Sequence, residues 1–164
     1  MRLFLISFLT ITLVSCKTKT TKVVPIQQIV DFNGYQSYVE NTKDTLLLVN
    51  FWATWCKPCV EELPYFIKAS QTYSSKKFKT VFVSLDRAAD FETKVIPFTT
   101  EKNMQTDLLL LNDVKNMNTW IRAINEHWTG AIPATILYKN GKQIYFHEGQ
   151  LKEDELNQLI NKYL

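Results

Sequence analysis

The chain has 164 residues, a length that fits one domain with its own core. Apolar residues make up 46% and aromatic residues 13% of the sequence, which is typical of a globular protein. The net charge is only +3 with both signs mixed along the chain, so the composition indicates no nucleic-acid partner.

The first 16 residues have the pattern of an export signal. Arg2 precedes an apolar run, Leu3–Val14, that is too short to span a bilayer but has the length of a signal-peptide core. The run ends in Leu13-Val14-Ser15-Cys16, which resembles a bacterial lipobox, where the cysteine becomes the lipidated first residue of the mature protein. The alternative is an ordinary signal peptide with a chance cysteine.

This pattern predicts three segments: a signal peptide over 1–15, a lipidated Cys16 with a tether over 16–25, and a folded domain over 26–164. A lipid on Cys16 would hold the domain at a membrane surface rather than across it. The chain has three cysteines, an odd number for an exported protein, and acylation of Cys16 would leave one pair. We therefore expect an exported protein on the periplasmic side of a bacterial membrane.

The folded part begins with a predicted helix over 26–41, for which Asp31 and Asn33 are candidate caps. An apolar run over 46–51 then predicts a strand buried on both faces. A helical apolar pattern follows from Val60 onward and contains Pro64, which predicts a kink.

Cys56 and Cys59 lie between this strand and this helix, with Cys56 expected at the junction and Cys59 in the first helical turn. The free N–H groups and the dipole of a helix start favour a thiolate, lowering a cysteine pKa from ~8.5 to roughly 3.5–7.5. Pro58 fits a first turn, and Lys57 adds a cation beside the thiols. The alternatives to a redox pair are a structural disulfide or half a zinc site, which would need two further ligands.

The stretch Val49–Cys59 resembles thioredoxin-like proteins, most closely the periplasmic thiol-disulfide oxidoreductases of the TlpA and ResA type. Three features carry the resemblance: Lys-Pro between the cysteines, Asn50 where thioredoxins have a buried Asp, and the continuation Cys-x-x-Cys-x-x-Glu-x-Pro through Glu62. The resemblance implies an α/β thioredoxin-like three-layer sandwich, with a mixed central sheet flanked by helices. It implies no metal and no organic cofactor.

The remaining elements follow in order: a strand over 78–85, a helix around Phe91 that Pro97 should end, a strand over 107–111 and a helix over 118–125. TlpA-like proteins carry an insert in this region, and the last strand and helix are interpreted as that strand-helix insert. An Asn-Gly turn at 140–141 predicts a hairpin over 134–147, and the chain closes with a helix over 152–163.

In thioredoxin-like proteins a loop ending in a cis-proline faces the cysteines, and Ile132-Pro133 matches that loop. The alternative is a trans proline that opens a strand. We expect Trp55, Ile132, Pro133 and Trp128 to form the substrate groove. Trp120 and Trp128 can line this groove, although core packing is expected for at least one of them.

The resemblance implies protein thiol-disulfide exchange, with Cys56 as the attacking and Cys59 as the resolving sulfur. Glu62 either tunes cysteine ionisation and proton transfer, as in ResA-like members, or is a solvated helix carboxylate. With Lys57 and Pro58 between the cysteines, and no histidine there, we expect a moderately lowered thiol pKa and a disulfide reductase. Its partners would be protein clients and a membrane electron donor of the DsbD or CcdA type.

Two other functions stay open. A peroxiredoxin-like peroxide reductase needs Thr or Ser three residues before the reactive cysteine, where this chain has Ala53. A lipid-anchored binding module with a purely structural disulfide would need no exchange chemistry.

Overall fold

The computed structural model describes residues 25–164, so the predictions for the signal peptide, for the lipid on Cys16 and for the tether up to residue 24 lie outside the described residues. The strands are β1 (Gln27–Val30), β2 (Leu46–Trp52), β3 (Phe78–Ser84), β4 (Asp107–Leu111), β5 (Ala134–Lys139) and β6 (Lys142–Glu148). The helices are α1 (Phe32–Asn41), α2 (Lys57–Thr72), α3 (Ile96–Glu101), α4 (Met117–Ile124) and α5 (Glu153–Tyr163). None of the helices within 25–164 has both the length and the apolar character needed to cross a bilayer.

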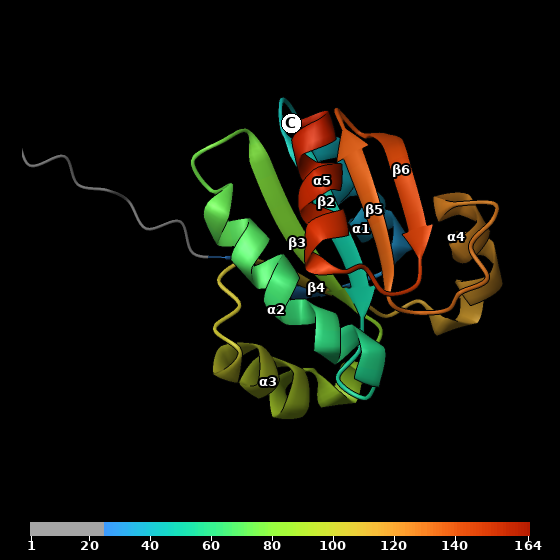
Figure 1. Ribbon diagram of the computed structural model, residues 1–164. Helices are drawn as coiled ribbons and strands as arrows, with labels where there is room; N and C mark the ends of the chain where they lie inside the picture. The colour runs from blue at the N-terminus through green and yellow to red at the C-terminus, as the bar shows by residue number, and fades with distance from the viewer. Residues whose placement is uncertain (1–24) are drawn as a thin grey trace, which may run out of the picture.

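The strands form one mixed sheet in the order β1-β4-β3-β2-β5-β6 (Figure 1). The first four of these are parallel neighbours, while β5 pairs antiparallel with both β2 and β6. Parallel strands end at the same edge of a sheet, which is where α/β proteins place their sites. The carboxyl end of β2 and the start of α2 lie at this edge, at the bottom of Figure 1.

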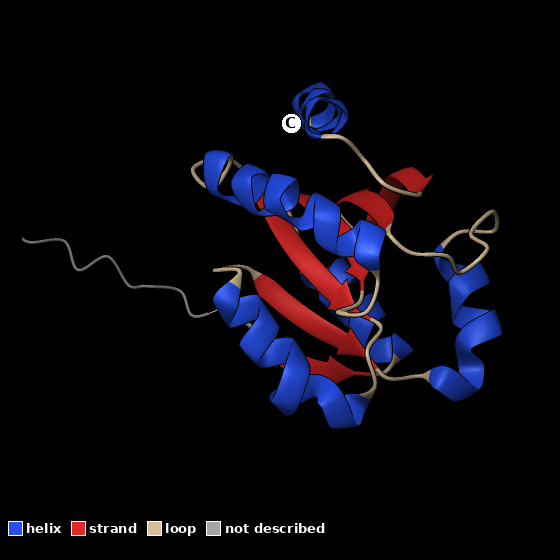
Figure 2. Cartoon of the chain, turned by 60° about the horizontal axis from the view of Figure 1, so that its bottom comes forward, coloured by secondary structure: helices blue, strands red, loops and turns tan. Residues whose placement is uncertain are grey.

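Helices cover both faces of the sheet, as Figure 2 shows. One core layer packs α2, α5 and the helical segment before α3 against the sheet, and the other packs α1 and α4 against it. This arrangement confirms the predicted thioredoxin-like sandwich.

Strand β2 lies inside the sheet between β3 and β5, and each of its seven residues is buried. Alternate side chains enter opposite cores, so that Leu46 and Leu48 face α2 and α5 while Leu47 and Val49 face α1 and α4. Burying an aliphatic side chain of this size contributes roughly 1.5–3 kcal/mol. The strand therefore gives the cysteines that follow it a rigid base.

The prediction of one helix over 26–41 was wrong in its first part. Residues Gln27–Val30 form the edge strand β1, paired in parallel with β4, and the helix begins only at Phe32. Asp31 caps this helix, as predicted, by accepting the N–H of Gly34 at 2.8 Å. The strand forms because β4, about eighty residues later, offers it a backbone partner.

The segment after β3 also differs from its prediction. A short 3-10 turn (Ala88–Asp90) and a π-helical turn (Phe91–Val95) lead into α3, and Pro97 lies in the first turn of α3 instead of ending a helix. Proline is tolerated there because first-turn N–H groups have no helical partner. The predicted strand over 107–111 is β4, and it lies inside the sheet between β1 and β3.

Candidate active site

The two cysteines lie where β2 passes into α2, as the sequence predicts. Cys56 is the N-cap of α2, and Pro58 stands in the first turn. The backbone N–H of Cys59, a first-turn donor, points at Cys56 Sγ from 3.4 Å. A disulfide with an S–S distance of 2.04 Å joins Cys56 and Cys59. The helix continues without interruption through Pro64 to Thr72.

The two sulfurs differ in access. Cys56 is 6% exposed and Cys59 is 0% exposed, so only Cys56 reaches the surface. Cys56 Sγ lies 3.6 Å from the carbonyl oxygen of Ile132, and the Ile132–Pro133 peptide bond is cis. The backbone N–H of Gly149 donates to the Pro133 carbonyl at 2.8 Å, which fixes this loop against the sheet. The proline loop thus lies beside the more accessible sulfur.

Glu62 is fully buried on the side of α2 that faces the core, so it is not the solvated carboxylate that the sequence left open. Its two oxygens accept hydrogen bonds from Asn50 Nδ2 and from the backbone N–H of Leu151, both at 2.8 Å. Burial raises the pKa of Glu62 from 4.5 to about 7, and the two hydrogen bonds offset part of that rise. Cys59 and Glu62 are three residues apart on this buried face of the helix.

Lys57 extends away from the protein. Its side chain is 88% exposed, and its ammonium lies 3.9 Å from the Glu61 carboxylate one turn along the helix. A solvated, partly compensated cation has little influence on a thiol. The helix start and the buried carboxyl group of Glu62, in contrast, lie in the protein interior on the cysteine-bearing part of α2.

The two tryptophans of the predicted groove lie in different places. Trp55, directly before Cys56, is 69% exposed and presents an apolar surface beside the disulfide. Trp128 is 3% exposed, so its placement in the groove was wrong. It packs on Phe51 and Trp120 in the core and donates its indole N–H to the Ala131 carbonyl at 2.9 Å. Burial of its large apolar ring, with the indole N–H hydrogen-bonded, stabilises Trp128 in the core more than exposure to solvent would.

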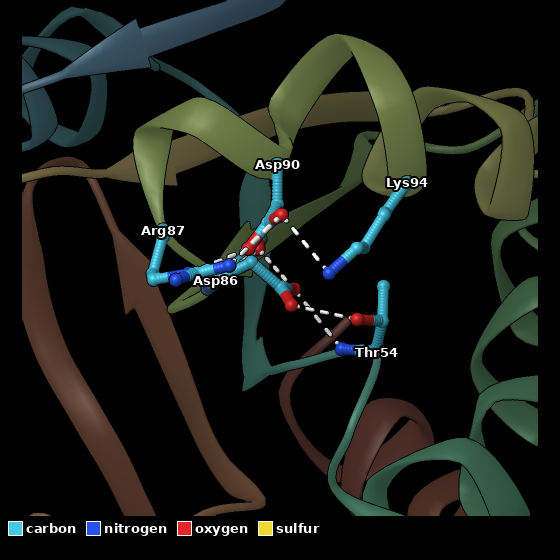
Figure 3. Close-up of polar contacts among 6 residues, drawn as sticks. Thr54, Asp86, Arg87, Asp90 and Lys94 are labelled. Atoms are coloured by element: carbon cyan, nitrogen blue, oxygen red, sulfur yellow. Dashed lines mark hydrogen bonds and ion pairs between the residues drawn. The ribbon is translucent and has the colours of Figure 1, made fainter.

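A carboxylate that the sequence reasoning missed holds the turn before Cys56. Asp86, just after β3, accepts the backbone N–H of Thr54 at 3.0 Å, the Thr54 hydroxyl at 2.6 Å and the Ser84 hydroxyl at 2.8 Å. Figure 3 shows Asp86 facing Thr54, next to the separate group in which Arg87 and Lys94 contact Asp90. Asp86 thus ties the loop that carries Trp55 and Cys56 to the end of the neighbouring strand.

The connection from β6 to α5 also contacts the site, and no sequence motif marks it. Gln150 Nε2 donates to the Pro58 carbonyl at 3.1 Å, and Leu151 donates to Glu62 as described above. Glu148, the last residue of β6 just before this connection, accepts the backbone N–H of Thr129, which precedes the proline loop, at 2.9 Å. One segment therefore touches both the cysteine motif and the proline loop.

Together, the fold and the disulfide at a helix start define a thioredoxin-like thiol-disulfide oxidoreductase. A model of the family described as AhpC/TSA matches residues 20–147, and the chain belongs to this family.

Known relatives agree with this class. The chain is 30% identical over 141 residues to the thioredoxin-like protein YneN of Bacillus subtilis, covering 82% of this chain and 78% of the relative. It is 24% identical over 147 residues to the thiol-disulfide oxidoreductase ResA of Bacillus cereus, covering 89% and 79% of the two chains. The crystal structure of StoA from Bacillus subtilis is similar in fold, with a TM-score of 0.55 and 23% identity, covering 72% of this chain and 84% of StoA.

Proposed function

We propose that the protein reduces disulfides of client proteins outside the cytoplasm, with Cys56 as the attacking and Cys59 as the resolving sulfur. The observation that carries this proposal is the asymmetry of the pair. Cys56 touches the surface beside the cis-proline loop, while Cys59 is enclosed on the same helix face as a buried carboxyl group, Glu62. A nucleophile that reaches the surface and an enclosed resolving thiol are what a two-step exchange requires.

In the first step the Cys56 thiolate attacks one sulfur of a client disulfide. A bond forms between Cys56 and the client, and the other client sulfur leaves as a thiolate. In the second step Cys59 loses its proton and attacks Cys56 Sγ, which releases the second client thiolate and restores the Cys56–Cys59 disulfide. The client gains two electrons and the protein loses two.

Two features support a role for α2 and Glu62 in these steps. The first-turn N–H of Cys59 faces Cys56 Sγ, so the helix start stabilises a thiolate on Cys56. Cys59 must lose its proton before it attacks Cys56 Sγ. Glu62, with its pKa raised to about 7, is suited to accept that proton near neutral pH. A charged Glu62 also disfavours the thiolates, and this favours a reducing protein over a strong oxidant.

We assign client contact to Trp55, Ile132 and Pro133. Trp55 is exposed, Ile132 is partly buried with its carbonyl at Cys56 Sγ, and Pro133 holds the loop in place. An extended client segment laid along this loop would bring its own sulfur to Cys56. Pro58 and Gln150 border the same surface, since both are exposed and they are hydrogen-bonded to each other.

The N-terminal sequence supports export and a lipid on Cys16, which places the domain on the periplasmic side of a membrane. A reductase in an oxidising compartment needs a supply of electrons. We propose a membrane donor of the DsbD or CcdA type, which would return the Cys56–Cys59 disulfide to two thiols by the same exchange chemistry.

The peroxide-reductase alternative has little support from the site. Ala53 provides no hydroxyl three residues before Cys56, and the hydroxyl of the adjacent Thr54 already donates to Asp86. The binding-module alternative differs in kinetics, because a structural disulfide would not turn over.

An insulin-reduction assay with dithiothreitol separates these functions. We expect the protein to accelerate the reduction of insulin and Cys56→Ser to abolish the acceleration. A wild-type protein that gives no acceleration would favour the binding module. Reduction of hydrogen peroxide faster than of insulin would favour the peroxide reductase.

A further inference from the structure

Exposed lysines gather at the end of the molecule opposite the disulfide. They come from the turn before β2, the α2–β3 loop, the β5–β6 turn and the last turn of α5. These six residues are Lys43, Lys76, Lys77, Lys139, Lys142 and Lys162, and we call this surface the lysine end. The strand directions bring these segments together at the amino edge of β2 and β3, at the top of Figure 1.

Direct contacts make the lysine end one surface. The backbone N–H of Asp44 donates to Asn140 Oδ1 at 2.9 Å, which joins the turn before β2 to the hairpin. Lys139 Nζ donates to the Tyr163 carbonyl at 3.2 Å, which joins the hairpin to α5. A shallow hollow joins the α2–β3 loop to α5, and its lining is Lys76, Lys77, Asn161 and Leu164.

The charges of the lysine end are not neutralised locally. Within residues 25–164, none of its six lysines forms an ion pair with a carboxylate, whereas Lys57 and Lys94 near the disulfide end contact Glu61 and Asp90. The exposed acids in the neighbouring segments are Glu40 and Asp44. Four of the 19 basic residues of the chain precede residue 25, so residues 25–164 carry 15 basic residues against all 16 acidic residues. The described domain is therefore close to neutral as a whole, and the lysine end is a local excess of positive charge.

The chain enters the fold on the side of this surface. Pro25 lines a hollow together with Ser74 and Phe78, which border the α2–β3 loop that carries Lys76 and Lys77. The preceding stretch 17–24 contains three more lysines and no acid, and it follows Cys16. Fully extended, a stretch of this length reaches at most roughly 26–29 Å.

We infer that the lysine end rests on the anionic phospholipid headgroups of a membrane, so that the disulfide faces away from the bilayer. The inference builds on the proposed membrane attachment, because a short basic tether brings this end of the domain close to the lipid. Each lysine near an anionic surface strengthens binding by roughly fivefold. The orientation would leave Trp55 and Cys56 open to clients in the surrounding compartment.

Lysine acetylation on vesicles tests this orientation. The full chain is reconstituted into vesicles of phosphatidylcholine alone or with phosphatidylglycerol, treated with an amine-reactive acetylating reagent, and analysed by mass spectrometry. We expect Lys76, Lys77 and Lys142 to react at least about fivefold more slowly on the anionic vesicles. Lys115 and Lys152 should react at the same rate on both kinds of vesicle. Adding 1 M salt should remove the difference at the lysine end, because the Debye length then falls to ~3 Å.

Charge-matched variants complete the test. Combining Lys76→Gln, Lys77→Gln and Lys142→Gln should remove the protection of Lys139 and Lys162, while combining Lys94→Gln, Lys115→Gln and Lys152→Gln should preserve it. Equal rates on both vesicles, a protein that stays in solution, or equal protection of Lys115 and Lys152 would overturn the inference. Insulin reduction and the mass of the Cys16 peptide are measured on the same samples, so a failure of the proposed function appears there and not in the labelling pattern.

Discussion

Replacement of Glu62 by glutamine should change how the stability of the protein depends on pH. In the folded protein, burial raises the pKa of Glu62 from 4.5 to about 7. The folded protein therefore holds this proton more tightly than the unfolded chain does, so this group lowers the free energy of unfolding as pH rises from about 4.5 to about 7. The loss amounts to about 3 kcal/mol and is complete above neutral pH.

The Glu62→Gln variant cannot ionise, so this pH-dependent loss disappears. Its amide NH₂ must face either Asn50 Nδ2 or the Leu151 N–H, both of which are donors, and this mismatch costs about 1–3 kcal/mol at every pH. We therefore expect the variant to be less stable than the wild type at pH 4.5. By pH 8.5 the difference should have closed or reversed.

Denaturant unfolding of the oxidised protein between pH 4.5 and 8.5 measures both free energies. Glu61→Gln is the matched control, because Glu61 is an exposed neighbour on the same helix, and its stability difference from wild type should be small at every pH. A Glu62→Gln difference that stays constant from pH 4.5 to 8.5 would refute the assignment of a raised carboxyl pKa.

Two further outcomes follow from the site and a third from the N-terminal sequence. Cys59→Ser should accumulate mixed disulfides with proteins in cells, whereas Cys56→Ser should not, and diagonal gels would reveal the reverse pattern if the roles are exchanged. Replacing Pro133 by alanine should slow insulin reduction more than it lowers the melting temperature, and a proportional loss of both would indicate a purely structural proline. Cys16→Ser should release the protein from membranes washed with 1 M salt while leaving insulin reduction intact, and cleaved protein that still sediments with these salt-washed membranes would contradict lipid attachment.

The parts of the fold that depend on local pattern could be read from the sequence. The buried run of β2, the helix start at Cys56 and the Asn140-Gly141 turn each have a signal confined to a few residues. Strand β1 could not be read in this way, because its partner β4 is distant in the sequence and its own residues are mostly exposed. An edge strand with little burial leaves no clear period of two.

The candidate site shows the same division. The two cysteines and the proline loop carry recognisable motifs, but the burial of Glu62 depends on Leu151, which no pattern near Cys59 reveals. The contact of Asp86 with Thr54 joins the ends of two strands and becomes visible only when β2 and β3 are paired. Trp128 was misplaced because closeness to the proline loop in sequence does not tell on which side of the loop a ring packs.

The reduction potential of the Cys56–Cys59 pair tests the central proposal most directly. Equilibrating the purified protein with glutathione or dithiothreitol buffers, and quantifying its thiols by alkylation, gives the potential. The helix start favours thiolate while the buried Glu62 opposes it, and Lys57 points into solvent, so we expect a reducing value on the order of −200 to −300 mV. A potential above roughly −150 mV, close to that of the oxidant DsbA, would contradict the reductase and identify an oxidase instead.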